Sequence, residues 1–321
     1  MLSSTSSSSA TSSGSDRPRL LRASGLLVGA LVVVAAGLEL AAGTVGVRSS
    51  RILSRMNTEH KSLLGFASSA AHPKTVVILG NSLLVEGVDY PAMQKDLSAA
   101  GWESRRFVVE QTGYYDWKFG LRRLTSEGCR PDAIVLMLSA TQFALNSYAG
   151  PAFAYNLMRA TDVVEVMQTT GIHPTEAASL LLARESIFFG LRLEFRKHLL
   201  FALVPGMNDL VRHLTPAGKP SPHAFVRAQV LRRLPELVGE AASLGQHLIL
   251  AIPPVAVGDD YAADVIEGGR LTGLPVLYPI RTGDLAADQF QDGFHLNASG
   301  AQVFTKALTS AMLQQLNSMR P

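Results

Sequence analysis

Short apolar segments alternate with helical segments from residue 74 onward, and this alternation restricts the chain to very few folds. The segments expected to form strands are residues 75–79, 106–109, 133–138, 247–252 and 276–278. Strands that are apolar throughout and are separated by helices are typical of a parallel sheet covered on both faces. We therefore predict a doubly wound α/β domain over residues 74–321.

Helix signals fill the gaps between these strands. After the first strand, Asp89 can cap a helix over residues 89–100, and Pro91 fits its first turn. Further helices are expected at 116–127, 223–244 and 298–316. Residues 141–220 have no strand pattern, and helical stretches are expected there at 160–169, 176–183 and 187–203. This part is predicted to be a helical insertion into the α/β domain.

The N-terminal part of the chain has a different composition. Residues 1–22 are rich in serine and end in arginines, a composition typical of a disordered tail. Residues 23–47 are mainly apolar, with Glu39 as their only charge, and the segment is longer than the 20 or so apolar residues that cross a bilayer. We expect a single transmembrane anchor here, followed by a linker over residues 48–73.

Two alternatives bear on this segment. Ala41 and Gly43 are spaced for signal-peptide cleavage after Gly43, but the apolar run continues past that site and favours the anchor. Three arginines stand on either side of the segment, so the balance of positive charge gives no orientation. A short tail before the span and a whole domain after it favour a single-pass protein of the cell membrane, with its domain outside the cytoplasm, in the periplasm or extracellular.

Composition excludes several classes of protein. The net charge is only +3 and the basic residues are dispersed, so nucleic-acid binding has little support. The single cysteine, Cys129, excludes an internal disulfide and a cysteine-based metal site, and a buried core residue is favoured over a reactive thiol. None of the eight histidines has a metal-binding spacing. We expect neither a metal nor another cofactor.

A candidate nucleophile follows the first strand, in Gly80-Asn81-Ser82. Ligands of open α/β sheets bind beyond the carboxyl ends of the strands, and a glycine before the serine allows a sharp turn there. Ser82 is then expected at the crevice. On its own, this segment also fits a serine that caps a helix or forms a turn.

A candidate base and acid lie near the end of the domain. Asp292 and His295 are three residues apart, so both can face one direction in a turn. A serine hydroxyl needs an imidazole to accept its proton and a carboxylate to orient that imidazole. Taken alone, His295 also fits a surface loop, but with Ser82 the two residues complete a catalytic set.

The segments Ile78-Leu79-Gly80-Asn81-Ser82-Leu83 and Asp292-Gly293-Phe294-His295-Leu296-Asn297-Ala298-Ser299-Gly300 together resemble the SGNH (GDSL-like) hydrolase superfamily, and the order of elements agrees over residues 74–317. The resemblance implies a flavodoxin-like three-layer fold with Ser82 as nucleophile, His295 as base and Asp292 as its partner. Asn81 stands where many members of the family have aspartate.

Two further family blocks line the oxyanion hole. The resemblance implies that the backbone N–H of Gly113, with that of Ser82, faces the developing negative charge. The third block normally reads Gly-x-Asn-Asp, but this chain has Ser139-Ala140-Thr141-Gln142. Thr141 and Gln142 are the candidate replacement donors. Loss of one such donor typically lowers the rate about 100-fold or more, so a weakened enzyme is one expected outcome.

The altered third block is similar to that of membrane-anchored members that handle acyl groups on cell-surface polysaccharides. The resemblance therefore implies an extracytoplasmic serine esterase or O-acyltransferase that acts on acetyl-type groups. Its partners would be an acylated glycan or acyl donor and a membrane acyltransferase or polysaccharide-assembly protein. A non-catalytic glycan-binding or assembly protein of the same fold is the main alternative, and a lipid hydrolase is a weaker one.

Two other segments have two interpretations each. Residues 184–197 combine apolar and basic residues at helical spacing, which favours a helix packed on the core over one that lies on anionic lipid headgroups. Tyr114, Tyr115 and Trp117 fit stacking on a sugar ring and ordinary packing equally well.

Overall fold

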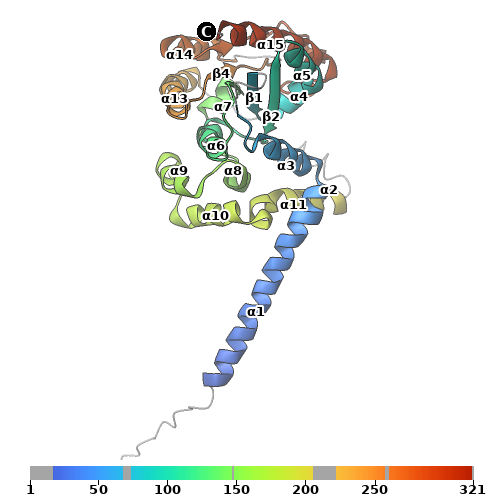
Figure 1. The fold of residues 1–321 in the computed structure, drawn as a ribbon, viewed down its shortest axis with the longest axis vertical. Coiled ribbons are helices and arrows are strands. Elements are labelled where there is room, and N and C mark those ends of the chain that lie inside the picture. Colours follow the sequence, from blue (N-terminus) through green and yellow to red (C-terminus); the bar gives the residue numbers. More distant parts are fainter. Residues whose placement is uncertain (1–16, 68–73, 147, 205–221, 257–259, 320–321) are drawn as a thin grey trace, which may run out of the picture.

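The computed structural model describes residues 17–67, 74–146, 148–204, 222–256 and 260–319 (Figure 1). Of the expected disordered tail, residues 1–16 lie outside these ranges. Residues 17–22 belong to the first helix, which corrects that part of the prediction. The end of the predicted insertion, residues 205–220, also lies outside the described ranges.

A five-stranded parallel sheet with strand order β2-β1-β3-β4-β5 forms the centre of the domain. Its strands are β1 (Lys74–Gly80), β2 (Trp102–Val108), β3 (Ala133–Met137), β4 (Leu248–Ala251) and β5 (Val276–Leu277). The predicted doubly wound α/β fold is confirmed. β2 begins four residues before the expected strand, because this edge strand alternates buried and half-buried residues and has no continuous apolar run.

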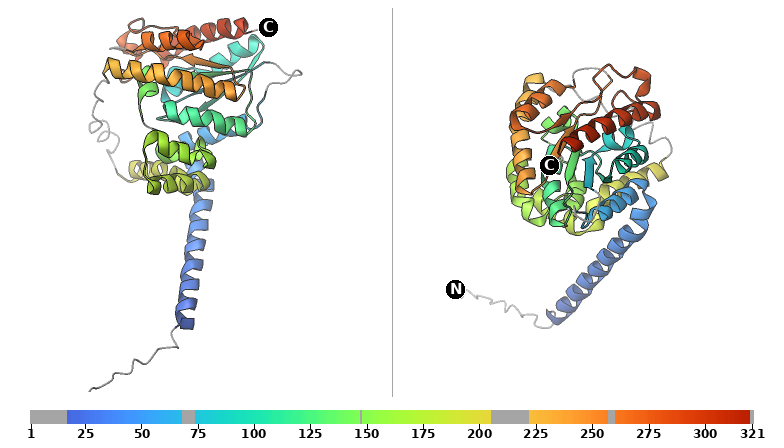
Figure 2. Two further views of the ribbon diagram at one scale, coloured as in Figure 1. Left: turned by 90° about the vertical axis from the view of Figure 1, so that its left-hand side faces the viewer. Right: turned by 45° about the horizontal axis from the view of Figure 1, so that its top comes forward.

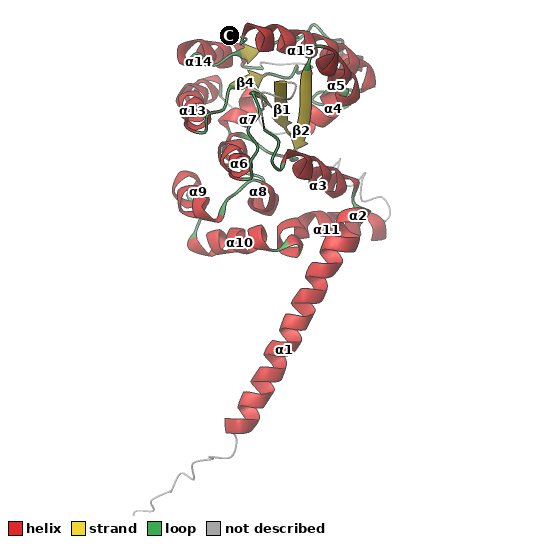
Figure 3. Cartoon of the chain, in the orientation of Figure 1, coloured by secondary structure: helices red, strands yellow, loops and turns green. Residues whose placement is uncertain are grey.

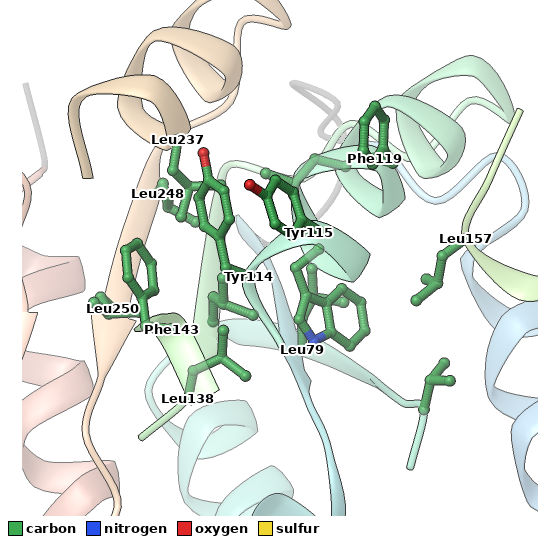
Figure 4. Close-up of a cluster of buried hydrophobic side chains, with 14 of the residues drawn as sticks. Leu79, Tyr114, Tyr115, Phe119, Leu138, Phe143, Leu157, Leu237, Leu248 and Leu250 are labelled. Atoms are coloured by element: carbon green, nitrogen blue, oxygen red, sulfur yellow. The ribbon is translucent and has the colours of Figure 1, made fainter. Parts of the chain in front are cut away.

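Helices cover both faces of the sheet because successive side chains of each strand point to opposite faces. Val77 and Leu79 of β1 belong to the cluster under α6 (Tyr114–Ser126), α13 (His223–Ser243) and α14 (Ala262–Thr272). Val76 and Ile78 belong to the cluster under α4 (Ser82–Gly87), α5 (Tyr90–Ala99) and α15 (Ala298–Ser318). Figures 1 and 2 show these layers, and Figure 4 shows part of the first cluster around Leu79.

The insertion after β3 is helical, as predicted, and no strand occurs in its described part, residues 141–146 and 148–204. Its elements are α7 (Ala140–Ala144), α8 (Gly150–Asn156), the 3-10 turn η2 (Ala160–Asp162), α9 (Val163–Thr170), α10 (Pro174–Glu185) and α11 (Ile187–Leu203). α7 and α8 have too few residues to show helical periodicity in the sequence.

The N-terminal helix projects away from the domain (Figures 1 and 3). α1 (Arg17–Ala41) continues through a π-helical turn, η1 (Ala42–Gly46), into α2 (Val47–Ser49). Within Leu21–Gly46, a window of 18 residues has a mean hydropathy of 2.2, and only 6% of that window is buried. Among the described helices this stretch alone is long and apolar enough to cross a membrane, and a signal sequence has the same properties.

Part of the segment expected to be a linker is instead a helix of the domain. α3 (Arg51–Leu63) buries Leu53, Met56 and Leu63 against it. Its Glu59 carboxylate accepts from the Arg106 guanidinium at 2.7 Å and from the Val108 N–H at 3.0 Å. These contacts tie α3 to the edge strand β2, so the folded unit begins before residue 74.

Candidate active site

Ser82 lies directly beyond the carboxyl end of β1, as the first residue of α4. A side chain at Gly80 would lie 3.1 Å from the Met137 carbonyl oxygen and 3.2 Å from Leu84 Cβ, so the backbone packs closely here and a glycine relieves the crowding. The strand order 2-1-3-4-5 reverses direction between β1 and β3, which is where ligands bind in such sheets. Ser82 therefore occupies the favoured position for chemistry in this fold.

Asn81 fixes the turn that presents Ser82. This fully buried side chain caps α4 by accepting from the Leu83 N–H at 3.1 Å. Its amide Nδ2 also donates to the Thr112 carbonyl oxygen at 2.8 Å, which joins the turn after β1 to the loop after β2. In this chain Asn81 is a structural group beside the serine.

His295 and Asp292 lie in the loop between the 3-10 turn η3 (Ala287–Gln289) and α15. Gly293 has φ of +79°, the left-handed conformation that favours glycine, and it turns the chain between the two side chains. Asn297 then caps α15 by accepting from the Ser299 and Gly300 N–H groups, both at 3.1 Å. The loop is held at both ends of the Asp-x-x-His segment.

The three side chains form one hydrogen-bonded chain. Ser82 Oγ lies 3.0 Å from His295 Nε2, and His295 Nδ1 lies 2.8 Å from Asp292 Oδ2. Asp292 Oδ1 additionally accepts from the backbone N–H of His295 at 2.7 Å. With the Nδ1 proton held by Asp292, His295 Nε2 is free to accept the serine proton.

The Asp292 carboxylate is half-exposed, but its contacts favour the charged form. Burial tends to raise its pKa, but hydrogen bonds from His295 and from the Phe294 N–H outweigh this effect and place the pKa below its ordinary value. Asp292 is therefore ionised throughout the neutral range, as the orienting role requires.

The Gly113 N–H has a different partner from the one expected of an oxyanion donor. It donates to Asp116 Oδ2 at 2.8 Å, in a cap that begins α6 at Tyr114 rather than at Asp116. A side chain at Gly113 would lie 2.8 Å from the Gln142 carbonyl oxygen, so the loops after β2 and β3 touch here. Gly113 therefore lies in the loop after β2, where an oxyanion donor is expected, but its N–H already donates to the Asp116 carboxylate.

Ser139 caps α7, and Thr141 and Gln142 lie in its first turn. Gln142 Oε1 accepts from the Ser139 N–H at 3.1 Å, and Thr141 Oγ1 lies 3.0 Å from Ser139 Oγ. Both side chains are half-buried in the loop beyond β3, close to Gly113. Gln142 retains its Nε2 donor, which has no partner among the described residues.

Asp116 supports this region and was missed by the sequence analysis, which assigned it only to a helix start. It is fully buried and accepts from the Gly113 and Ala149 N–H groups, both at 2.8 Å. Burial raises its pKa to about 7 despite these hydrogen bonds. The Gly113-x-x-Asp116 spacing, which matches a cap residue and the third residue of a helix, is the signal that could have shown it.

Arg233 of α13 is the second missed residue. Its fully buried guanidinium donates to the carbonyl oxygens of Phe143 and Leu145, both at 2.8 Å, and so holds the chain that follows α7. It also lies over the rings of Tyr114 and Tyr115, at 5.0 and 4.8 Å from their centroids. The i, i+4, i+7 spacing from Val226 through Val230 to Arg233 places it on the buried face of the helix.

Several other predictions concern residues that prove to be buried. Tyr114, Tyr115 and Trp117 are at most 4% exposed, so they pack in the core and do not stack on a sugar (Figure 4). Cys129 is buried, and burial raises the pKa of its thiol to about 12, which agrees with a core residue. Within the described ranges, no three His, Cys, Asp or Glu side chains are grouped so that they could hold a metal ion.

Comparisons with known proteins include a distant similarity to a solved structure. No family model matches the chain, and no curated protein matches it. Among solved structures, it is similar to Est2A, an acetyl xylan esterase from the rumen bacterium Butyrivibrio proteoclasticus, with 12% identity and a TM-score of 0.36. The match covers 79% of this chain and 66% of that one, just under two thirds of its length. Values this low carry no inference about activity, which has to come from the geometry of the site.

Proposed function

We propose that the chain is a serine esterase or O-acyltransferase that works through an acyl-Ser82 intermediate. The observation that carries this proposal is the hydrogen-bonded chain from Ser82 through His295 to Asp292, with links of 3.0 and 2.8 Å. These three groups stand at the carboxyl edge of the sheet, where a substrate can reach the serine.

The proposed reaction has two steps. Ser82 Oγ attacks the acyl carbonyl carbon while His295 Nε2 takes the hydroxyl proton, and Asp292 stabilises the imidazolium that forms. His295 then protonates the departing alkoxide, which leaves an acyl ester on Ser82. In the second step the oxygen of water, which gives hydrolysis, or of a sugar hydroxyl, which gives transfer, attacks the acyl carbon while His295 Nε2 takes its proton. His295 then returns this proton to Ser82 Oγ as the acyl–Ser82 bond breaks, which restores the free serine.

The proposed substrate is an acetyl-type ester on a cell-surface polysaccharide, with the domain outside the cytoplasm. Two features support this assignment. The altered third block resembles that of membrane-anchored members of the SGNH superfamily, and Leu21–Gly46 is an apolar stretch long enough to cross a membrane. We further propose that Leu21–Gly46 remains as a membrane anchor, and that a membrane acyltransferase or polysaccharide-assembly protein is the partner.

One observation favours the alternative, a glycan-binding or assembly protein that has lost most of its activity. The Gly113 N–H donates to Asp116 Oδ2, so one expected oxyanion donor has another partner. A site with fewer oxyanion donors is slower by about 100-fold for each donor lost.

Hydrolysis of an acetylated glycan by the purified full-length chain tests the proposal. The unsubstituted protein is expected to release acetate, and Ser82→Ala is expected to release none above background. Acetate release that persists in Ser82→Ala would contradict the serine mechanism. Glycan binding without any acetate release, unchanged in Ser82→Ala, would establish the alternative.

A further inference from the structure

The helices α10 and α11 form the layer of the domain from which α1 projects (Figures 1 and 3). A second view at 90° shows the same arrangement, with α1 leaving from this layer (Figure 2). The layer therefore lies nearest to any membrane that α1 enters.

Glu39, the only charged residue within residues 23–47, binds the start of α11. Its carboxylate accepts from the Ile187 N–H at 2.5 Å, the Phe188 N–H at 3.2 Å and the Ser186 hydroxyl at 2.7 Å. These two N–H groups belong to the first turn of α11 and have no partner within their own helix. A negative charge is also favourable at the positive end of the helix dipole. The contact explains an acid in an apolar helix and fixes α1 against α11.

Two glycines bring the end of the apolar stretch close to α11. A side chain at Gly46 would lie 2.6 Å from the Phe195 ring, and one at Gly43 would lie 3.2 Å from Ile187 Cδ1. Residues 43–46 therefore pack directly on α11. Since a helix rises about 1.5 Å per residue, the 18 steps from Leu21 to Glu39 span about 27 Å. This is close to the hydrocarbon thickness of about 30 Å, so α11 begins near the edge of the bilayer.

The outer face of α11 suits that location. Its inner face packs on the domain through Leu191, which is buried. Residues 189, 193, 200 and 203 follow an i, i+4, i+11, i+14 pattern that places them on one face of the helix. This face exposes Phe189, Leu193, Leu200 and Leu203 by 38, 53, 40 and 69%. We call these four residues the apolar stripe.

Basic side chains lie on the apolar stripe and beside it. Arg192 and Arg196 lie on the same side of α11 by helical spacing, and Lys197 lies at its edge. Long basic side chains can keep their charge at lipid headgroups while their carbon chains cover apolar surface. An exposed apolar face with basic residues beside it is the pattern of a helix that lies in the membrane interface.

We propose that the apolar stripe of α11 rests in the interfacial layer of the phospholipid bilayer beside α1. The inference depends on the proposed retention of α1 as a membrane anchor. The apolar stripe would give the domain a second contact with the bilayer in addition to α1. Two contacts fix the orientation of the domain relative to the membrane. It also gives residues 184–197 a lipid-facing side in addition to their packing side.

Depth-dependent quenching in vesicles tests this proposal. The full-length chain is placed in vesicles of phosphatidylcholine and phosphatidylglycerol, with a fluorophore on a single introduced cysteine at Leu193→Cys. Leu271→Cys on α14 is the matched control, because Leu271 is also an exposed leucine on a helix, 61% exposed, and Figure 1 shows α14 at the end of the domain away from α1. Leu31→Cys within the apolar stretch reports on the anchor itself. The native Cys129 is buried, and the unsubstituted chain sets its background.

Nitroxide-labelled lipids are expected to quench the fluorophore at residues 31 and 193 and to leave the one at residue 271 unquenched. Quenching at 31 with residue 193 as unquenched as 271 would overturn the membrane contact of α11 while the anchor stands. Absence of quenching at residue 31 would overturn the anchor, and this inference with it. Neither result depends on esterase activity, so the catalytic proposal is tested separately.

Discussion

At the scale of single residues, the site depends on the hydrogen bonds that join three side chains. Ser82, His295 and Asp292 are linked in the order that serine activation requires, with distances of 3.0 and 2.8 Å. Asp292 is bound on both of its oxygens, which leaves its geometry little freedom. Small substitutions at these atoms should therefore change the rate rather than substrate binding.

Asp292→Asn should lower kcat by about 100-fold or more with little change in KM, because an amide cannot both accept from His295 Nδ1 and keep the charge that stabilises the imidazolium. Steady-state hydrolysis of an acetyl ester measures both constants. Asp288→Asn, an exposed aspartate in the 3-10 turn η3 that precedes this loop, is the matched control and should retain full activity. Equal kcat in the two variants would exclude Asp292 from the mechanism.

The raised pKa of Asp116 predicts how the stability of the protein depends on pH. Its pKa in the folded protein is about 7, above the ordinary value of 3.8, because the carboxyl is buried. The folded state therefore holds more protons than the unfolded state between these values, so the contribution of Asp116 to stability falls as the pH rises from about 4 to about 7. The slope is at most about 1.4 kcal/mol per pH unit.

Chemical unfolding in detergent at several pH values between 4 and 8 checks this expectation. The free energy of unfolding of the unsubstituted chain should decrease relative to that of Asp116→Asn as the pH rises through this window. Parallel curves for the two proteins would show that Asp116 does not titrate as described.

At the scale of elements, the loops after β1, β2 and β3 converge through close contacts. Asn81 binds the Thr112 carbonyl group, Gly113 touches the Gln142 backbone, and Arg233 holds the chain after α7. These contacts place the Ser82 turn, the second loop and the altered third loop around one point. Of these contacts, the one at Gly113 leaves the least room for a side chain.

Gly113→Ala should destabilise the protein by about 1–3 kcal/mol and reduce activity, because the new methyl group would lie 2.8 Å from a backbone oxygen. Gly239→Ala in α13 is the matched control. No atom lies within 4 Å of a side chain at Gly239, and alanine favours a helix, so this variant should be as stable as the parent or up to about 1 kcal/mol more stable. Thermal unfolding compares the two. Equal melting temperatures would show that the second and third loops are not in tight contact.

At the scale of the whole molecule, the sequence predicted the α/β domain, the order of its elements and the helical insertion. These follow from apolar strands and turn residues, which are local signals. Asn297 and the residues after it likewise begin a helix as expected. The Asp-x-x-His segment and the serine turn were both identified, and the structure brings them together across 213 positions of the chain.

Other features depend on contacts that no local pattern shows. α3 was assigned to a linker because its mean hydropathy is low, although one face is apolar and packs on the domain. The hydrogen bond from the Gly113 N–H to Asp116 Oδ2 was not anticipated, because the sequence does not show which acceptor this N–H meets in the fold. The presence of an acidic residue, Glu39, in an apolar helix is explained by its contact with the start of α11, which lies almost 150 residues away in the sequence.

The most direct test of the central claim is covalent labelling of the full-length chain, in detergent micelles, by a fluorophosphonate probe that reacts only with an activated serine. Labelling is expected in the unsubstituted protein and in Ser318→Ala, a control at the far end of α15. It should be lost in both Ser82→Ala and His295→Ala. Labelling that survives in either variant, or an absence of labelling in the folded parent chain, would contradict activation of Ser82 by His295.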